Sequence, residues 1–245
     1  MKRLMALLLA VLMVLGLAAC GGDKAETKAP ADDTPKAKSY KGMTAAFVGD
    51  SITNGAELQK GDMIYWQIVS ANLELGEITG MGVNGSCYST KSEFGLDHQP
   101  LMTRYQKIPQ ADLIFIALGC NDFGRNTPMG TIEDKEDISF YGAMNFILDQ
   151  LATQCPDSQI VLLTPIPRPS LGVNKLNLKL RDYADAIIAV GQARQIPVVD
   201  MLTLTAPNFP EGLFVDGVHP DKFGHQVMAQ TLQTWLEENV ETLGK

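Results

Sequence analysis

Short apolar runs alternate with longer segments of helical periodicity along most of this chain. The apolar runs are rich in β-branched or aromatic residues and are bounded by turn residues, which is typical of buried parallel strands. Such alternation predicts an α/β fold in which helices cover both faces of a parallel sheet of about five strands. The predicted strands cover residues 44–48, 77–81, 113–118, 159–164 and 197–201, of which 77–81 is the weakest candidate. The predicted helices cover residues 64–75, 141–151, 176–190 and 222–240.

The composition is that of a globular protein. Hydrophobic residues make up 45% of the 245 residues and charged residues 20%, so the chain as a whole is too apolar to be disordered. There are 28 acidic and 20 basic residues, and the formal net charge is -8. Binding to nucleic-acid phosphates requires clustered Lys and Arg, and the sequence contains no such cluster. We therefore expect no nucleic-acid partner.

The first twenty residues predict export. Lys2 and Arg3 precede sixteen uncharged, mostly apolar residues, a run shorter than the roughly 20 residues that a membrane-spanning helix needs. The run ends in Leu-Ala-Ala-Cys, which resembles a bacterial lipobox, a signal in which the Cys is acylated. We expect a signal peptide over residues 1–19 and a lipid on Cys20 that attaches the protein to the bacterial membrane, at the cell surface or on the periplasmic side. A plain signal peptide or an uncleaved anchor are the alternatives, and both would also export the chain.

The segment after the leader differs from the rest of the chain. Residues 23–38 contain no large apolar side chain, so they cannot bury enough surface to offset the loss of conformational entropy on folding. We expect a disordered tether over residues 20–40. The remaining 205 residues, 41–245, suit a single folded domain.

The cysteines of this domain do not form a recognisable framework. Cys87, Cys120 and Cys155 are neither CxxC-spaced nor even in number, so we expect no zinc site. Export would allow a disulfide between Cys87 and Cys120. In a core of this size, however, buried free thiols are the favoured expectation.

Polar segments follow the predicted strands at their carboxyl ends. The segments are Gly-Asp-Ser at 49–51, Gly-Val-Asn-Gly at 82–85 and Gly-Cys-Asn-Asp at 119–122. A fourth segment, Asp-Gly-Val-His-Pro at 216–220, precedes the last predicted helix. Because ligands of open α/β sheets bind outside the carboxyl ends of the strands, we expect the segments to line one crevice.

Together these segments contain the groups that acyl transfer by a serine requires. The reaction needs a nucleophilic hydroxyl, an imidazole base, a carboxylate that orients the imidazole, and donors for the oxyanion. Ser51 lies at a predicted strand-to-helix turn, and His219 follows Asp216 by three residues, so the carboxylate can reach ring Nδ1 while Nε2 faces outward. The side-chain amide of Asn121 and the backbone N–H groups of Gly85 and Ser51 are then candidate oxyanion donors.

The four segments in this order resemble the SGNH hydrolases, also called GDSL esterases and lipases. The serine block of that family matches residues 49–51, its glycine block 82–85, its Gly-x-Asn-Asp block 119–122 and its Asp-x-x-His block 216–219. The resemblance implies a flavodoxin-like three-layer α/β/α sandwich that works without a metal or other cofactor.

The resemblance also implies a role for each matching residue, and these roles agree with those inferred from position alone. Asp50 and Asp122 match family positions too, and we expect them to be structural, bonding nearby loop amides. The implied roles are nucleophile and oxyanion donor for Ser51, further oxyanion donors for Gly85 and Asn121, general base and then acid for His219, and orienting carboxylate for Asp216.

Several residues outside the four segments lie near them in the predicted fold. His98 is either an ordinary loop residue or part of the crevice lining, and His225 is expected to be a helix-surface or packing residue. Met63, at helical spacing, is expected in the core. Residues 123–140 directly follow the Asn121 block and are expected to flank the substrate entrance.

The sequence thus predicts an exported, lipid-tethered serine esterase that forms an acyl-enzyme on Ser51. Its substrate would be an ester-bearing small molecule or glycan. No long apolar lid or exposed apolar helix is visible to receive a fatty chain, so we favour short acyl groups such as acetyl on glycans. Hydrolysis of phospholipids or lysophospholipids is the alternative enzymatic function. A surface lipoprotein that binds glycan or lipid without turnover is the alternative outside the enzyme class.

Overall fold

The computed structural model of the protein describes residues 38–169 and 172–245. The predicted signal peptide and the lipid site at Cys20 lie outside the described residues. The predicted tether extended too far, because residues 38–40 belong to the folded part. Ser39 and Lys245 exchange two backbone hydrogen bonds of 3.0 Å, and the buried Tyr40 donates its hydroxyl to the carbonyl of Leu236 at 2.8 Å.

Five parallel strands form the central sheet, in the order β2-β1-β3-β4-β5. This is the flavodoxin-like order of a doubly wound sheet, so the predicted fold class is confirmed. Only β5 is much shorter than expected, because Asp200 caps a following helix and accepts the N–H of Thr203. The strands are β1 (Ala45–Gly49), β2 (Ile78–Gly82), β3 (Leu113–Ala117), β4 (Gln159–Leu163) and β5 (Val198–Val199).

Four longer helices correspond to the four predicted ones. The helix expected over 176–190 begins and ends four residues later, because the side chain of Asn174 accepts the N–H groups of Leu176 and Leu178 and holds that segment in a loop. The longer helices are α2 (Tyr65–Asn72), α4 (Phe140–Gln154), α5 (Leu180–Arg194) and α7 (Lys222–Glu238). The short helices are α1 (Ser51–Asn54), α3 (Cys120–Gly124), α6 (Met201–Thr205) and α8 (Val240–Leu243).

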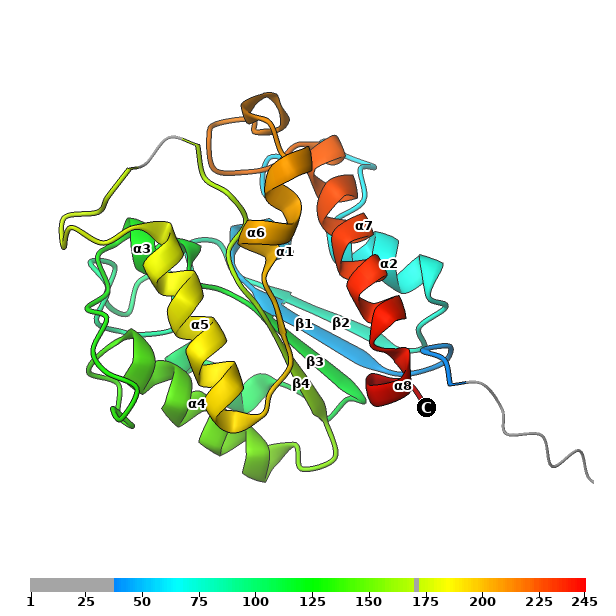
Figure 1. The fold of residues 1–245 in the computed structure, drawn as a ribbon, viewed down its shortest axis with the longest axis horizontal. Coiled ribbons are helices and arrows are strands. Elements are labelled where there is room, and N and C mark those ends of the chain that lie inside the picture. The colour runs from blue at the N-terminus through cyan, green and yellow to red at the C-terminus, as the bar shows by residue number, and fades with distance from the viewer. Residues whose placement is uncertain (1–37, 170–171) are drawn as a thin grey trace, which may run out of the picture. The chain divides into compact units, whose positions relative to one another are not determined.

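Helices cover both faces of the sheet, with α4 and α5 on one side and α2 and α7 on the other (Figure 1). In β1, Ala46 and Val48 pack on the α4–α5 side, whereas Ala45 and Phe47 pack on the α2–α7 side. Successive side chains of a strand point to opposite faces, so a strand covered on both faces must be apolar throughout. That is the physical reason why continuous apolar runs marked the strands.

The three strands β2, β1 and β3 are neighbours in the sheet, and their carboxyl ends lie side by side. The loops that follow them therefore meet at one edge of the sheet. In the described part of the chain, none of the helices has the length and apolar character required to cross a membrane.

Candidate active site

Ser51 is the first residue of α1 and directly follows the end of β1. Asp50 caps this helix, because its Oδ1 accepts the N–H of Ile52 at 3.0 Å. Gly49 is required by close packing, since a Cβ at this position would lie 2.0 Å from Thr53 Oγ1 and 2.9 Å from the carbonyl oxygen of Ala117. The tight strand-to-helix turn thus holds the Ser51 hydroxyl at the carboxyl end of the sheet.

A chain of hydrogen bonds joins Ser51 to the loop before α7. Ser51 Oγ lies 2.9 Å from His219 Nε2, and His219 Nδ1 lies 2.7 Å from Asp216 Oδ2. Asp216 Oδ1 also accepts the backbone N–H groups of Val218 at 2.9 Å and His219 at 2.8 Å. With the Nδ1 proton directed at the carboxylate, Nε2 is left to accept a proton from the serine hydroxyl.

The three candidate oxyanion donors lie on the loops after β1, β2 and β3. Asn121 Nδ2 is 3.2 Å from the carbonyl oxygen of Ser86 and 3.4 Å from Asp50 Oδ2. Gly85 has a φ of 77°, and a Cβ there would lie 2.7 Å from Cγ of His98. Among the described residues, no protein group accepts a hydrogen bond from the N–H of Ser51 or Gly85. Backbone N–H groups and an amide arranged in this way can bind a developing oxyanion.

The family model described as GDSL-like Lipase/Acylhydrolase matches residues 47–227. This span covers most of the chain and contains all four motif segments. The chain belongs to the GDSL-like lipase/acylhydrolase family. It is an ester-hydrolysing serine hydrolase, as the sequence predicted. No sequence among the curated proteins matches it.

Solved structures share the fold of this GDSL-like hydrolase. A protein from Lactobacillus plantarum is 28% identical, with a TM-score of 0.71 over 82% of this chain and 98% of its own. A possible lipase from Chitinophaga pinensis is 21% identical, with a TM-score of 0.64 over 80% of this chain and 98% of its own. A catalytic mutant of an acetylxylan esterase from Geobacillus stearothermophilus is 17% identical, with a TM-score of 0.58 over 82% of this chain and 95% of its own.

Asp216 is ionised at neutral pH in the hydrolase. Partial burial favours the neutral acid, but hydrogen bonds from the backbone and ring of His219 and from the backbone of Val218 outweigh it. Together they lower the pKa of Asp216 to about 2. An ionised carboxylate at this position can stabilise an imidazolium at His219.

The two other aspartates of the motifs bond loop amides, as we expected. Complete burial raises the pKa of Asp50 to about 6, although the hydrogen bond from Ile52 and electrostatic attraction to the His219 ring and to the Arg104 guanidinium act in the opposite direction. Asp122 accepts the N–H of Tyr88 at 2.9 Å and so ties the glycine-block loop to α3. Burial raises the pKa of Asp122 to about 7, against the hydrogen bonds that it accepts.

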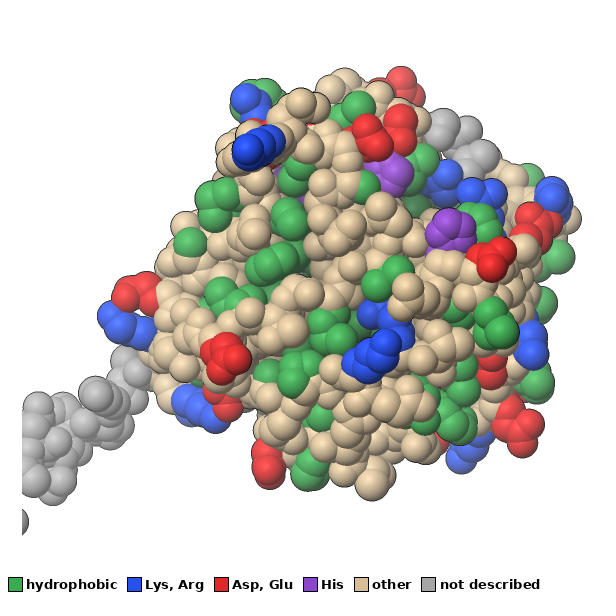
Figure 2. Space-filling model, turned by 180° about the vertical axis from the view of Figure 1, so that it is seen from behind, with side chains coloured by type: hydrophobic (Ala, Val, Ile, Leu, Met, Phe, Trp, Pro, Cys, Tyr) green, Lys and Arg blue, Asp and Glu red, His purple; other side chains and the backbone are tan. Residues whose placement is uncertain are grey.

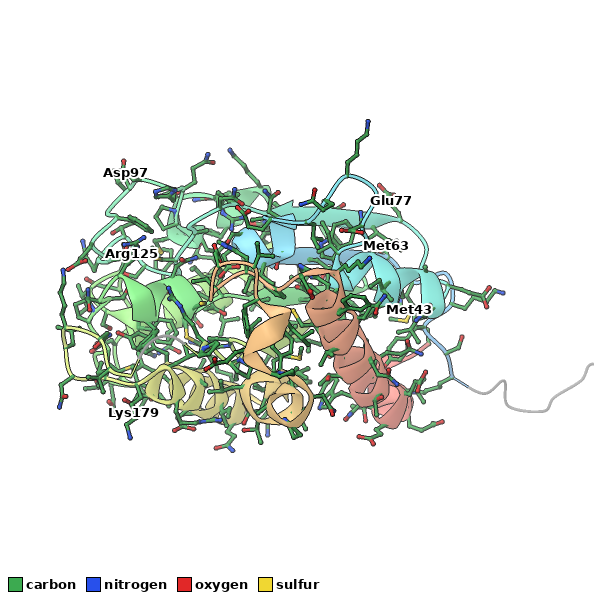
Figure 3. The ribbon with its side chains drawn as sticks, turned by 90° about the horizontal axis from the view of Figure 1, so that it is seen from above. Met43, Met63, Glu77, Asp97, Arg125 and Lys179 are labelled. Atoms are coloured by element: carbon green, nitrogen blue, oxygen red, sulfur yellow. The ribbon has the colours of Figure 1, made fainter. Side chains whose placement is uncertain are left out.

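His98 lies against the glycine block, with its Nδ1 3.2 Å from the carbonyl oxygen of Asn84. Its ring centroid is 4.3 Å from that of Phe94, and the guanidinium of Arg125 lies 4.0 Å over the same Phe94 ring. Arg125 belongs to the 123–140 segment, so this part of the segment packs, through Phe94, against the loop that carries His98. Seen from above, Arg125 and Asp97 lie toward one side of the molecule and Met63 toward the other (Figure 3).

His225 and Met63 differ in burial. His225 is a packing residue, since it is fully buried on α7 and its Nδ1 accepts the N–H of Tyr65 at 3.2 Å. The prediction that Met63 belongs to the core is wrong, because its side chain is 46% exposed. The helix begins only at Tyr65, so Met63 lies on the loop before it.

The three cysteines within the described residues, Cys87, Cys120 and Cys155, are buried and carry free thiols, in agreement with the favoured expectation. Burial raises the pKa of Cys120 to about 12, so this thiol is not a nucleophile at neutral pH. Within the described ranges, no three His, Cys, Asp or Glu side chains are grouped as metal ligands.

Sequence reasoning missed Arg104. This residue is only 4% exposed, and its guanidinium donates to the carbonyl of Gly49, next to the serine turn. Nothing in the local sequence distinguishes it from the exposed Lys107 nearby, because its acceptors lie on other elements of the fold.

Proposed function

We propose that the protein is a serine esterase that removes short acyl groups, acetyl above all, from glycans. The observation that carries this proposal is the continuous chain from Ser51 Oγ through His219 to Asp216, at 2.9 and 2.7 Å, beside the amide of Asn121. This arrangement can activate a hydroxyl, stabilise an oxyanion and protonate a leaving alcohol in one place.

The proposed reaction has two halves. His219 Nε2 takes the proton of Ser51 as Oγ attacks the ester carbonyl carbon, and the carbonyl oxygen becomes an oxyanion bound by the N–H groups of Ser51 and Gly85 and the amide of Asn121. His219 then gives its proton to the leaving alcohol, which leaves an acyl-Ser51 ester. Water attacks this ester while His219 takes the water's proton, and the acid departs as the proton returns to Ser51. Asp216 stays ionised throughout.

One comparison supports a short acyl group. The small cavity at the carboxyl end of the sheet is lined mainly by apolar side chains together with Asp50 and Thr164, and neither Ser51 nor His219 lines it, so it does not limit the length of the acyl chain. The acetylxylan esterase named above has the same fold, and its substrate class is the one that we propose here.

A second candidate is hydrolysis of phospholipids or lysophospholipids. Large apolar side chains are exposed near His219: Val215 at 54%, on the same loop, and Phe223 at 52%, in the first turn of α7. Met63 is 46% exposed and lies just before α2. The start of α2 is joined to α7 by the hydrogen bond from the Tyr65 N–H to His225. An apolar rim of this kind can contact a lipid, and this observation favours the second candidate.

Acyl-chain dependence separates the two candidates. The purified protein would be assayed on p-nitrophenyl esters of two, eight and sixteen acyl carbons, on acetylated xylan and on lysophosphatidylcholine vesicles. We expect the highest kcat/KM on the acetyl ester and release of acetate from xylan. A preference for the sixteen-carbon ester and the vesicles would replace the glycan proposal with the lipid one.

Loss of the nucleophile tests catalysis itself. We expect Ser51→Ala to lower kcat by at least about 10³-fold. Ser70→Ala is the matched control, because Ser70 is also buried but its hydroxyl has no hydrogen-bond partner among the described residues. Equal rates for wild type and Ser51→Ala would exclude the esterase and leave the non-catalytic surface lipoprotein that binds glycan or lipid.

We also propose that the esterase is exported and attached to the bacterial membrane by a lipid on Cys20. The support is the leader pattern of residues 1–20. When it is expressed from its full sequence, the protein should fractionate with membranes, and the Cys20→Ala variant should be found in the soluble fraction.

On the face seen in Figure 2, basic and acidic side chains of the described residues are interspersed, which is consistent with a partner other than nucleic acid.

A further inference from the structure

We infer that Arg104 is a positioning residue that holds the oxyanion donors of this site in register with the nucleophile. The inference rests on the proposed function. Its evidence is a set of hydrogen bonds that joins loops far apart in the sequence.

Arg104 spans the carboxyl ends of two neighbouring strands. Its Nη2 donates to the carbonyl of Gly49, the last residue of β1, at 2.9 Å, and its Nη1 to the carbonyl of Met81 in β2 at 3.1 Å. Asp50 and Ser51 directly follow Gly49, and the glycine block directly follows Met81. One planar group therefore fixes the distance between the serine turn and the start of the glycine block.

The same guanidinium also holds the far side of the glycine block. Nη2 donates to Ser86 Oγ at 3.1 Å, and Nε donates to the carbonyl of Gln99 at 3.1 Å. Ser86 Oγ in turn donates to the same Gln99 carbonyl at 3.0 Å. Gly85 is thus held between two points of attachment to Arg104, Met81 before it and Ser86 after it.

Ser86 extends the link to the third donor. The backbone carbonyl of Ser86 accepts the side-chain N–H of Asn121 at 3.2 Å. Arg104 is therefore one hydrogen bond from the serine turn and one from the glycine block, and it is linked to the amide of Asn121 by two hydrogen bonds through Ser86. All three candidate oxyanion donors depend on this network for their relative positions.

The chemistry of the network requires arginine. Guanidinium carries five N–H donors in a rigid plane, whereas the ammonium of lysine is a single point on a flexible stem. Arg104 forms no ion pair within the described ranges, and its four acceptors are three carbonyl oxygens and one hydroxyl. Burial lowers the pKa of Arg104 to about 10, partly offset by the charge of Asp50, so the group remains cationic at neutral pH.

Oxyanion donors act only at short range. They must lie 2.7–3.1 Å from the position that the oxyanion occupies, and a displacement of about 1 Å can lower the rate by about 10²-fold. A loss of register between the loops should therefore lower kcat, while KM, which depends on contacts made elsewhere, should change little.

The test compares Arg104→Met and Arg104→Lys with Arg194→Met. Arg194 is a matched control, since its guanidinium also donates several hydrogen bonds to protein oxygens. Its acceptors are Asn145 and Asp149, which lie on α4 and away from the site.

The assays are kcat and KM on p-nitrophenyl acetate and the Ki of phenylboronic acid, which adds to a serine Oγ and places an oxygen where the oxyanion forms. We expect both Arg104 variants to lose about 10²-fold in kcat with KM within about threefold, and their Ki to rise in parallel. Arg194→Met should lose stability but keep its kcat and Ki.

Three results would overturn the inference. The first is an unchanged kcat in folded Arg104→Met. The second is a wild-type kcat in Arg104→Lys, which would mean that the positive charge alone is required. The third is a loss of kcat in Arg194→Met as large as that in Arg104→Met. If the Arg104 variants do not fold, Ser86→Ala decides, because it removes one acceptor of the network; several-fold lower kcat supports the inference and an unchanged kcat refutes it. Ser51→Ala is measured alongside, since activity that survives this change contradicts the proposed function and not the role of Arg104.

Discussion

Asp216 has two functions at the scale of a single side chain, and its two carboxylate oxygens divide them. Oδ1 accepts two backbone N–H groups and shapes the loop, while Oδ2 accepts the Nδ1 proton of His219. The loop and the orientation of the imidazole therefore depend on the same residue. Substitutions can separate these functions.

Asp216→Asn should abolish most of the activity and leave the fold intact. The amide oxygen can still accept the backbone N–H groups of Val218 and His219, but the neutral amide favours the wrong tautomer of the ring and cannot stabilise an imidazolium. We expect kcat to fall by about 10³- to 10⁴-fold at an unchanged Tm. Asp221→Asn is the control, because asparagine caps helices as well as aspartate does and activity should persist. A nearly active Asp216→Asn enzyme would refute the proposed role of the carboxylate.

Gly85→Ala tests the glycine block. Both Gly85, with a φ of 77°, and Gly95, with a φ of 57°, lie in the left-handed region, where alanine costs about 1–2 kcal/mol. A Cβ meets His98 at Gly85 but nothing within 4 Å at Gly95. We expect both alanine variants to have lower free energies of unfolding, and only Gly85→Ala to have a lower kcat. Loss of kcat in both would show that strain in this loop, and not the donor at Gly85, limits the rate.

At the scale of elements, the N-terminus of α7 joins the core to the site. Asp221 Oδ1 accepts the N–H groups of Phe223 and Gly224, each at 2.8 Å, and His225 one turn along binds the start of α2. His219 lies just before this cap. The start of the helix thus sets where the catalytic loop leaves the core.

Asp221→Ala should destabilise the protein with little effect on the chemistry. Loss of an N-cap costs about 1 kcal/mol, which should appear as a lower Tm in thermal unfolding. The loop that carries His219 keeps its own bonds to Asp216, so kcat should change less than about threefold. A large drop in kcat at an unchanged Tm would mean that the cap positions His219 directly.

For the whole molecule, buried ionisable groups make stability depend on pH in opposing ways. Burial lowers the pKa of His225 to about 4, partly opposed by the charge of Asp221, whereas burial raises the pKa values of Asp50 and Asp122 to about 6 and 7. Below pH 6.5 the unfolded chain binds a proton at His225 that the folded chain refuses, so acid destabilises the fold through this residue. The two aspartates act in the opposite direction, because the folded state takes up their protons first.

Removing His225 should isolate its contribution. Between pH 7 and pH 4, wild type should lose about 2–3 kcal/mol more of its free energy of unfolding than His225→Gln does. Urea unfolding at several pH values measures the difference, and His98→Gln, which removes an exposed imidazole, is the control. Parallel pH dependence of wild type and His225→Gln would contradict this account.

Activity should have its own dependence on pH. A protonated His219 cannot accept the proton of Ser51, so kcat/KM should fall as that ring takes up a proton on acidification. The measurement is the rate on p-nitrophenyl acetate across the range in which the protein stays folded. A flat profile would count against His219 as the base.

The sequence by itself determined the elements and the four motif segments, because apolar periodicity and turn chemistry are local properties. They were sufficient to predict the order of strands and helices, and with the family resemblance they named the groups around Ser51. Tertiary structure alone decided what depends on residues distant in the chain. It brought His219 within 2.9 Å of a serine 168 residues away, buried Tyr40 against α7, and gave Arg104 its acceptors on separate loops. Burial and hydrogen-bond networks arise only when the chain folds, and no local pattern encodes them.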